Sequence, residues 1–178
     1  MHAPLTIADA LPRNECERLL ALIPPECMRP AGLVGSVTDT SIRRAEVAWL
    51  DDVPEAAWVM DRMTGLIARA NREAFGFEID DLAESAQAAR YDAAQAAHFD
   101  WHTDIGAGAL AARRKLTVVV QLSDPTDYEG GLLELRSDSN ILAADAAQGT
   151  ATVFPSFVLH RVTPVTEGLR WSLASTSR

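Results

Sequence analysis

Residues 98–106 read HFDWHTDIG and place two histidines and two aspartates within seven positions. The pattern His-x-Asp occurs twice, as HFD at 98–100 and as HTD at 102–104. His98 and His102 also have the spacing with which two histidines bind zinc from one face of a helix. The segment therefore indicates a metal site, and two kinds of site fit it.

The first kind is a zinc hydrolase site that uses His98 and His102. A helical motif of this type places a glutamate directly after the first histidine as general base, but this chain has Phe99 there. Aromatic and β-branched residues at alternate positions of the segment also favour a strand over a helix. The zinc site is therefore the weaker alternative.

The second kind is an iron site on a strand. Side chains alternate along a strand, so His-x-Asp puts an imidazole and a carboxylate on the same face. A second histidine from elsewhere would complete a 2-His-1-carboxylate triad, which binds Fe(II) and leaves positions open. Besides His2, only His160 remains in the sequence, and Arg170 follows it by ten residues.

Alternation alone does not choose between the two His-x-Asp pairs. In one continuous strand, His98, Asp100, His102 and Asp104 would share a face, so both pairs remain candidates. The residues between them would point the other way. These residues are Phe99, Trp101 and Thr103, and we expect them to pack against the long helix predicted at 54–75.

Two helices and several strands are expected to position these residues. Apolar spacing predicts helices at 14–23 and 54–75, with Gly76 as the stop of the second. A short extended run lies between these two helices, at 46–50. Strands are predicted at 86–91, 97–102, 115–122, 132–136, 150–154, 159–162 and 169–175. This order predicts an α+β, mainly β protein: a sandwich, jelly roll or small barrel with supporting N-terminal helices.

Composition narrows the classes of function. The 178 residues suggest one domain, 1–178, with residues 1–80 as a helical support region and 81–178 as the β core. The net charge of −9 disfavours nucleic acid as a partner. No apolar run has membrane-spanning length, and the first residues lack a signal peptide's pattern. The two cysteines have no CxxC spacing, so a reducing, cytoplasmic location is expected.

Five stretches follow one another along the chain: Tyr91, WHTD at 101–104, RKLT at 114–117, YEGGLL at 128–133 and HRVTPVTEGLR at 160–170. Together they resemble the prolyl-4-hydroxylase-like branch of the Fe(II)/2-oxoglutarate dioxygenases. The resemblance covers roughly residues 41–178 and includes IRR at 42–44 and VAWL at 47–50. One departure is DAAQ at 92–95, where the family has glycine. The resemblance implies a double-stranded β-helix, which is a cupin-like jelly roll.

The resemblance also implies a ligand set. In this branch a tryptophan precedes the ligand histidine, which selects the second pair. The implied Fe(II) ligands are His102, Asp104 and His160, and these are the implied catalytic residues. The implied 2-oxoglutarate contacts are Arg170, Tyr91 and Ser172. His98 and Asp100 would then lie on the barrel wall or its rim, where either could contact substrate.

The implied reaction uses Fe(II), 2-oxoglutarate and O₂ to hydroxylate a C–H bond, with release of succinate and CO₂. The substrate would be a protein or peptide residue of the prolyl type, or a small amino-acid-like molecule. A cupin-like metal-binding module without turnover is the non-enzymatic alternative. Thr117 and Gln121 are weaker candidates for residues that line the substrate pocket. Residues 105–111 are a candidate for a mobile lid beside the metal.

Overall fold

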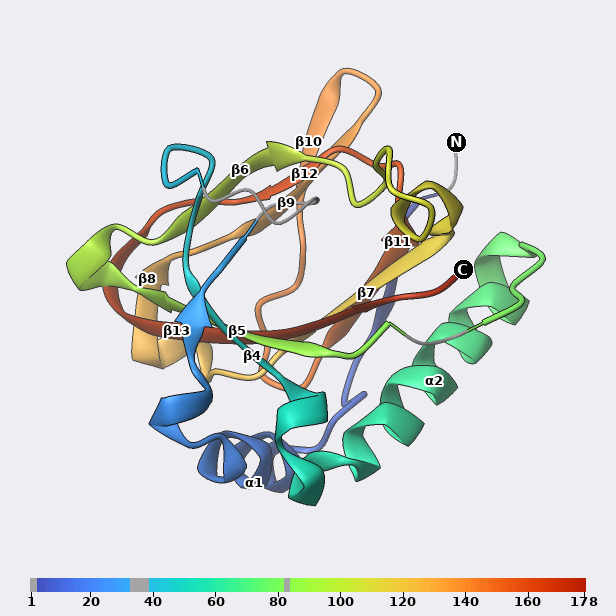
Figure 1. Cartoon of the computed structure of the whole chain (residues 1–178). Coiled ribbons are helices and arrows are strands. Elements are labelled where there is room, and N and C mark those ends of the chain that lie inside the picture. The colour runs from blue at the N-terminus through green and yellow to red at the C-terminus, as the bar shows by residue number, and fades with distance from the viewer. Residues whose placement is uncertain (1–2, 33–38, 82–83) are drawn as a thin grey trace.

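The computed structural model describes residues 3–32, 39–81 and 84–178, whose strands form two facing antiparallel sheets (Figure 1). The larger sheet has the order β1-β11-β7-β13-β5-β4-β2, and β8 pairs with β13. The smaller sheet has the order β10-β9-β12-β6-β3. The strands of the larger sheet are β1 (Leu5–Ile7), β2 (Arg29–Pro30), β4 (Glu46–Trp49), β5 (Gln87–Asp92), β7 (Leu116–Gln121), β8 (Tyr128–Gly130), β11 (Ala151–Pro155) and β13 (Val165–Thr176). Those of the smaller sheet are β3 (Arg43–Arg44), β6 (His98–His102), β9 (Leu133–Ser137), β10 (Asn140–Ala143) and β12 (His160–Val162).

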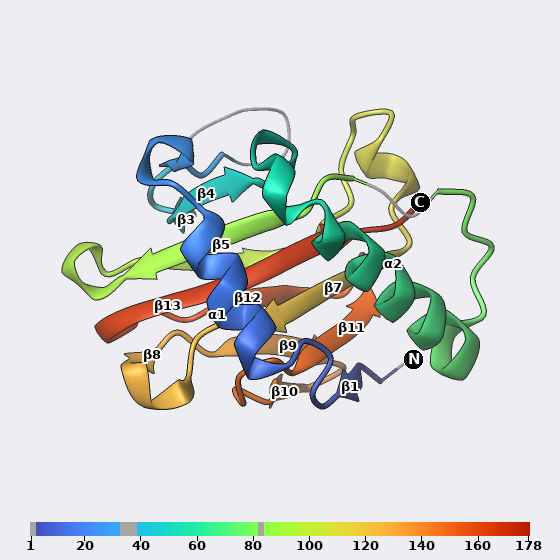
Figure 2. The same ribbon diagram turned by 90° about the horizontal axis from the view of Figure 1, so that it is seen from below.

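Two helices, α1 (Arg13–Leu22) and α2 (Trp58–Ala70), cover the outer face of the larger sheet (Figure 2). The apolar face of α2 packs in the same core as alternate residues of β7. The fully buried members from these two elements include Val59, Met63 and Ile67 of α2 and Val118 and Val120 of β7. Burial of these side chains stabilises the packing of α2 on the larger sheet. None of the described helices has the length and apolar character needed to cross a bilayer.

A second core lies between the two sheets. Tyr91 and Phe154 of the larger sheet are buried together with Leu135 and Val162 of the smaller sheet. The inner faces of both sheets therefore bound an interior that is partly packed and partly open, and the candidate site lies in its open part.

The predicted elements correspond closely to the observed ones, and the prediction of a mainly β fold is confirmed. The helix predicted at 54–75 is divided in three: a short 3₁₀ turn precedes α2, and a π-helical turn at 71–75 follows it. Gly76 ends this segment with φ of +68°, a left-handed conformation that glycine adopts without steric cost.

Residues 1–80, predicted as a helical support region with one extended run at 46–50, are not helical alone. This part of the chain also contributes the four strands β1–β4, which join both sheets. Three of them are only two or three residues long and carry too few residues for an alternating pattern to reveal them.

Candidate metal centre and its cavity

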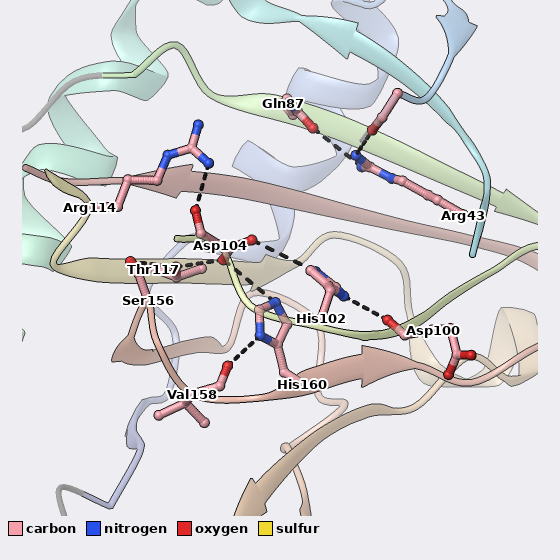
Figure 3. A network of polar contacts seen from close by, with 11 residues as sticks. Arg43, Gln87, Asp100, His102, Asp104, Arg114, Thr117, Ser156, Val158 and His160 are labelled. Atoms are coloured by element: carbon pink, nitrogen blue, oxygen red, sulfur yellow. Dashed lines mark hydrogen bonds and ion pairs between the residues drawn. The ribbon is translucent and has the colours of Figure 1, made fainter. Parts of the chain in front are cut away.

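The pairing of β6 with β12 brings together the three residues that were predicted as metal ligands. His102 and His160 are directly opposite each other in this pair. Asp104 follows the end of β6, and its backbone N–H donates to the Ser156 carbonyl at 2.9 Å. One ligand atom from each of His102, Asp104 and His160 lies within 4.8 Å of the others (Figure 3).

Both imidazoles are oriented by backbone carbonyls. His102 Nδ1 lies 2.7 Å from the Asp100 carbonyl oxygen, and His160 Nδ1 lies 2.9 Å from that of Val158. A carbonyl only accepts, so each Nδ1 carries a proton and each neutral ring keeps its Nε2 lone pair free. Both Nε2 atoms face Asp104, at 3.7 Å and 3.5 Å from its carboxylate oxygens. This is the tautomer that metal-binding histidines need.

Burial also keeps His102 neutral. Desolvation, followed by the neighbouring His160, lowers the pKa of His102 to about 4, against the opposing attraction of Asp104. Since a metal binds the neutral imidazole, His102 is ready for coordination at neutral pH without losing a proton.

Asp104 accepts hydrogen bonds from two side chains that are distant from it in sequence. Thr117 Oγ1 on β7 donates to Asp104 Oδ2 at 2.7 Å, and Arg114 Nη1 donates to the Asp104 carbonyl at 2.8 Å. Thr117 is 2% exposed and its hydroxyl also lies 3.0 Å from Ser156 Oγ. The carboxylate therefore has a fixed orientation toward the two imidazoles (Figure 3).

The structure corrects the expected facing of β6. His160 pairs with His102 but Val162 pairs with Phe99, so β6 has one extra residue across this interval. Such a bulge reverses the alternation of side chains. Phe99 consequently lies on the face of His102, with the two ring centroids 3.4 Å apart.

His98 therefore does not share the face of His102. Its ring nitrogens lie 3.1 Å from the carbonyl oxygens of Ala96 and Ser41. The exposed Asp100 carboxylate accepts from the Trp101 backbone N–H at 2.7 Å. The zinc alternative is wrong, because His98 and His102 lie on a strand and not one helical turn apart.

The prediction that Phe99, Trp101 and Thr103 pack against the long helix is wrong as well. They belong to the smaller sheet or follow it, while α2 covers the other sheet. Phe99 lines the interior cavity, and Trp101 lies beneath the Arg161 guanidinium, 4.7 Å from it.

A cavity of about 740 Å³ opens between the sheets, next to these three residues. Its wall includes Tyr91 and Ser172, both predicted as 2-oxoglutarate contacts, as well as Thr117 and part of the loop at 105–111. The cavity is large enough for a small cosubstrate and part of a second molecule.

Arg170, the predicted carboxylate-binding residue, is 1% exposed beside this cavity. It lines a small adjoining recess that shares Val119 and Leu133 with the cavity wall. Its Nη2 donates to Gln121 Oε1 at 2.7 Å, and its guanidinium lies 5.2 Å from the centroid of the Tyr91 ring. Burial lowers the pKa of this guanidinium.

The remaining nitrogens of Arg170 supply a test of whether an oxoacid fits. Nε and Nη1 are buried and have no hydrogen-bond partner among the described residues. Leaving such donors unpaired is costly, and a carboxylate satisfies a guanidinium in fork geometry. The residues present therefore fit a dicarboxylate whose other end reaches the His-Asp-His group.

Two residues around Arg170, Tyr128 and Gly131, were not predicted from the sequence as part of the site. The Tyr128 hydroxyl accepts from Gln121 Nε2, which places a second buried phenol beside the arginine network. Gly131 has φ of +60°, and a Cβ there would lie 2.8 Å from Arg170 Cδ. Both lie in the YEGG stretch at 128–131, which is one of the five stretches that carry the family resemblance.

Comparison with known proteins finds similarity to oxygenases and hydroxylases. A model of the 2OG-Fe(II) oxygenase superfamily matches residues 86–176. A PKHD-type hydroxylase of Azoarcus sp. (strain BH72) is 40% identical over 78 residues, which are 41% of this chain and 34% of the relative. One of Acidovorax ebreus (strain TPSY) is 41% identical over 58 residues, 33% of this chain and 26% of the relative. The chain thus spans about a third or less of the length of these relatives.

Solved structures share the fold over nearly the whole chain. A prolyl-4-hydroxylase of Pseudomonas putida superposes with a TM-score of 0.76 at 22% identity, covering 100% of this chain and 93% of that one. A prolyl hydroxylase of Trichoplax adhaerens, in complex with a hypoxia inducible factor peptide fragment, gives 0.79 at 19% identity, covering 99% and 84%. These similarities confirm the predicted β-helix type of fold.

The matched region begins just before β5 and ends with β13, so it contains all three residues of the His-Asp-His group and Arg170. It includes 86–176 of the 178 residues, which is more than half of the chain. The chain therefore belongs to the 2OG-Fe(II) oxygenase superfamily.

Proposed function

We propose that the protein is an Fe(II)- and 2-oxoglutarate-dependent dioxygenase that hydroxylates a C–H bond of its substrate. The observation that carries the proposal is that the His-Asp-His group lines the cavity while the unpaired Arg170 donors lie in the recess that adjoins it. Each alone has a structural explanation. Together they provide a site for a metal and a site for the far end of a dicarboxylate.

His102, Asp104 and His160 would hold Fe(II) through two imidazoles and one carboxylate, which leaves positions open for other ligands. With metal, 2-oxoglutarate and O₂ bound, one oxygen atom enters the substrate as a hydroxyl and the other enters succinate, with loss of CO₂. The protein orients the three ligands through the Asp100 and Val158 carbonyls and through Thr117.

Arg170, Tyr91 and Ser172 would bind 2-oxoglutarate. Arg170 offers two unpaired donors to the far carboxylate, and Tyr91 and Ser172 line the adjoining cavity. Arg170 is buried, so its contact with a carboxylate would be shielded from solvent. The loop at 105–111, which contributes Gly108 to the wall, would act as a lid over the cavity.

The substrate would be a protein or peptide residue of the prolyl type, or a small amino-acid-like molecule. Support comes from the hydroxylase names of the sequence relatives and from the peptide bound to the Trichoplax adhaerens structure. A cytoplasmic location is part of the proposal and is supported by the free thiols of Cys16 and Cys27.

Anaerobic titration with Fe(II) and 2-oxoglutarate tests the proposal. The visible charge-transfer band of the ternary complex should form in the wild type, vanish in His102→Ala and weaken in Arg170→Met. Oxygen should then convert 2-oxoglutarate to succinate and CO₂. A band without succinate would point to a binding module without turnover, and no band in the wild type would refute the proposed cofactors.

A further inference from the structure

Arg43 is a cationic residue of the cavity that the proposed metal and oxoacid sites do not use. Its strand β3 pairs with β6, and Arg43 is directly opposite Phe99. The Arg43 guanidinium lies 4.4 Å from the centroid of the Phe99 ring, which in turn stacks on His102. The positive charge of Arg43 is thus one aromatic ring away from a proposed iron ligand.

The charge of Arg43 has no acidic partner. The half-buried guanidinium donates to the Gly32 carbonyl at 2.9 Å and to Gln87 Oε1 at 3.3 Å, and both acceptors are neutral. Its Nε is buried without a hydrogen-bond partner among the described residues. All 25 acidic residues lie in the parts of the chain that the structure describes, and none of them forms an ion pair with Arg43 within 4.0 Å.

The other charges around the cavity do not compensate Arg43. Glu84 is paired with Arg114 through both carboxylate oxygens, and Asp104 belongs to the His-Asp-His group. Arg29, also on the cavity wall, donates to backbone carbonyls and forms no ion pair with any residue that the structure describes. In a chain of net charge −9, this wall carries uncompensated positive charge. Such a surface attracts an anion.

We infer that Arg43 determines substrate specificity by binding a carboxylate of the molecule that is hydroxylated. The inference rests on the proposed function and narrows its substrate class to anionic amino acids or peptides. The carboxylate is either the free α-carboxylate of the reacting residue or an Asp or Glu side chain beside it. A guanidinium that is already ordered by Phe99, Gly32 and Gln87 binds such a group with little loss of side-chain entropy.

Binding of matched probes to the anaerobic Fe(II)·2-oxoglutarate complex tests this inference. One pair is N-acetylproline and its neutral amide, and the other is acetyl-Pro-Asp-amide and acetyl-Pro-Asn-amide. Saturating 2-oxoglutarate keeps the probes from Arg170. We expect the anionic member of at least one pair to bind about tenfold more tightly in equilibrium dialysis. The pair whose two members differ in affinity shows whether Arg43 binds the α-carboxylate or the side-chain carboxylate.

Three variants assign the preference to a residue. Arg43→Gln should make the affinities of the anionic and the neutral probe equal, while Arg43→Lys should keep part of the preference for the anionic probe. Arg44→Gln is the matched control, because the neighbouring Arg44 is exposed and donates to the Gln95 carbonyl. Its preference for the anionic probe should equal that of the wild type.

The failures of the two proposals are distinguishable. If the charge-transfer band forms but neither pair discriminates, or if Arg43→Gln keeps the preference, the inference about Arg43 is wrong and the oxygenase assignment stands. If the wild type forms no band, the proposed function fails and the inference falls with it.

Discussion

Thr117 Oγ1 donates to Asp104 Oδ2 across 2.7 Å and so connects the larger sheet to the proposed iron ligand. Thr117 is in β7 of that sheet, and its hydroxyl is also in contact with Ser156 Oγ. Because Asp104 lies just beyond the end of β6, no pairing within its own sheet fixes its side chain. Thr117 supplies that constraint.

Replacing Thr117 by valine should therefore weaken Fe(II) binding about 10- to 100-fold, as expected for loss of a group that orients a metal ligand. Anaerobic Fe(II) titration measures the effect. Thr117→Ser retains the hydroxyl and should bind Fe(II) nearly as well as the wild type. Equal affinities of the valine variant and the wild type would contradict a positioning role.

Anaerobic titration with Fe(II) and 2-oxoglutarate should show which of the two His-x-Asp pairs binds the metal. His98→Ala should keep the charge-transfer band, because the His98 nitrogens contact the Ala96 and Ser41 carbonyls and not the His-Asp-His group. His102→Ala should lose it. Loss of the band in His98→Ala, with a folded protein by circular dichroism, would overturn the ligand assignment.

Local patterns predicted much of the fold because they are repeated along the chain. Thr117 and Gln121, predicted as pocket-lining residues, line the cavity and its adjoining recess, while the apolar residues that alternate with them in β7 are buried in the core with α2. Gly76 marked the end of the helical region because the chain there needs a positive φ. The ligand pair, in contrast, was selected by resemblance and not by alternation.

The bulge in β6 was not predictable in this way. One extra residue between Phe99 and His102 leaves no mark in composition, yet it moves Phe99 into the cavity. Arg43 was missed for a related reason. Its place beside Phe99 depends on the pairing of β3 with β6, two segments distant in sequence.

Arg170→Lys should lower the affinity for 2-oxoglutarate tenfold or more although the charge is kept. An ammonium lacks the planar donor pair of a guanidinium, and it would also lose the geometry of the Gln121 contact. The dependence of the charge-transfer band on 2-oxoglutarate concentration measures this. Fe(II) affinity without 2-oxoglutarate should be unchanged, and unchanged 2-oxoglutarate affinity would refute the assignment.

The metal-free protein should lose stability in mild acid because of His102. Its pKa falls from 6.5 to about 4 on folding, so the unfolded chain binds more protons between these values. Stability from this group is present above pH 6.5 and decreases as the pH falls toward 4. Urea unfolding at pH 7.5 and pH 5 should show a loss of about 2 kcal/mol from this residue.

Other groups also titrate in this range, so the comparison needs a variant without the imidazole. His102→Gln should show a smaller decrease in the free energy of unfolding between the two pH values. An identical decrease in both proteins would show that His102 is not protonated preferentially in the unfolded state.

Gly131→Ala should disturb both stability and the oxoacid site. A methyl group there would lie 2.8 Å from Arg170 Cδ and 2.9 Å from Val165 Cγ2, and the backbone φ of +60° disfavours alanine. We expect a destabilisation of about 1–3 kcal/mol together with weaker 2-oxoglutarate binding, since Arg170 must move. Gly65→Ala provides the opposite case, because Gly65 is exposed on α2 with nothing within 4 Å of an added Cβ. That variant should be stabilised by about 0.5–1 kcal/mol with unchanged 2-oxoglutarate binding. If Gly131→Ala were destabilised but bound 2-oxoglutarate normally, the packing of Gly131 against Arg170 would serve the fold alone.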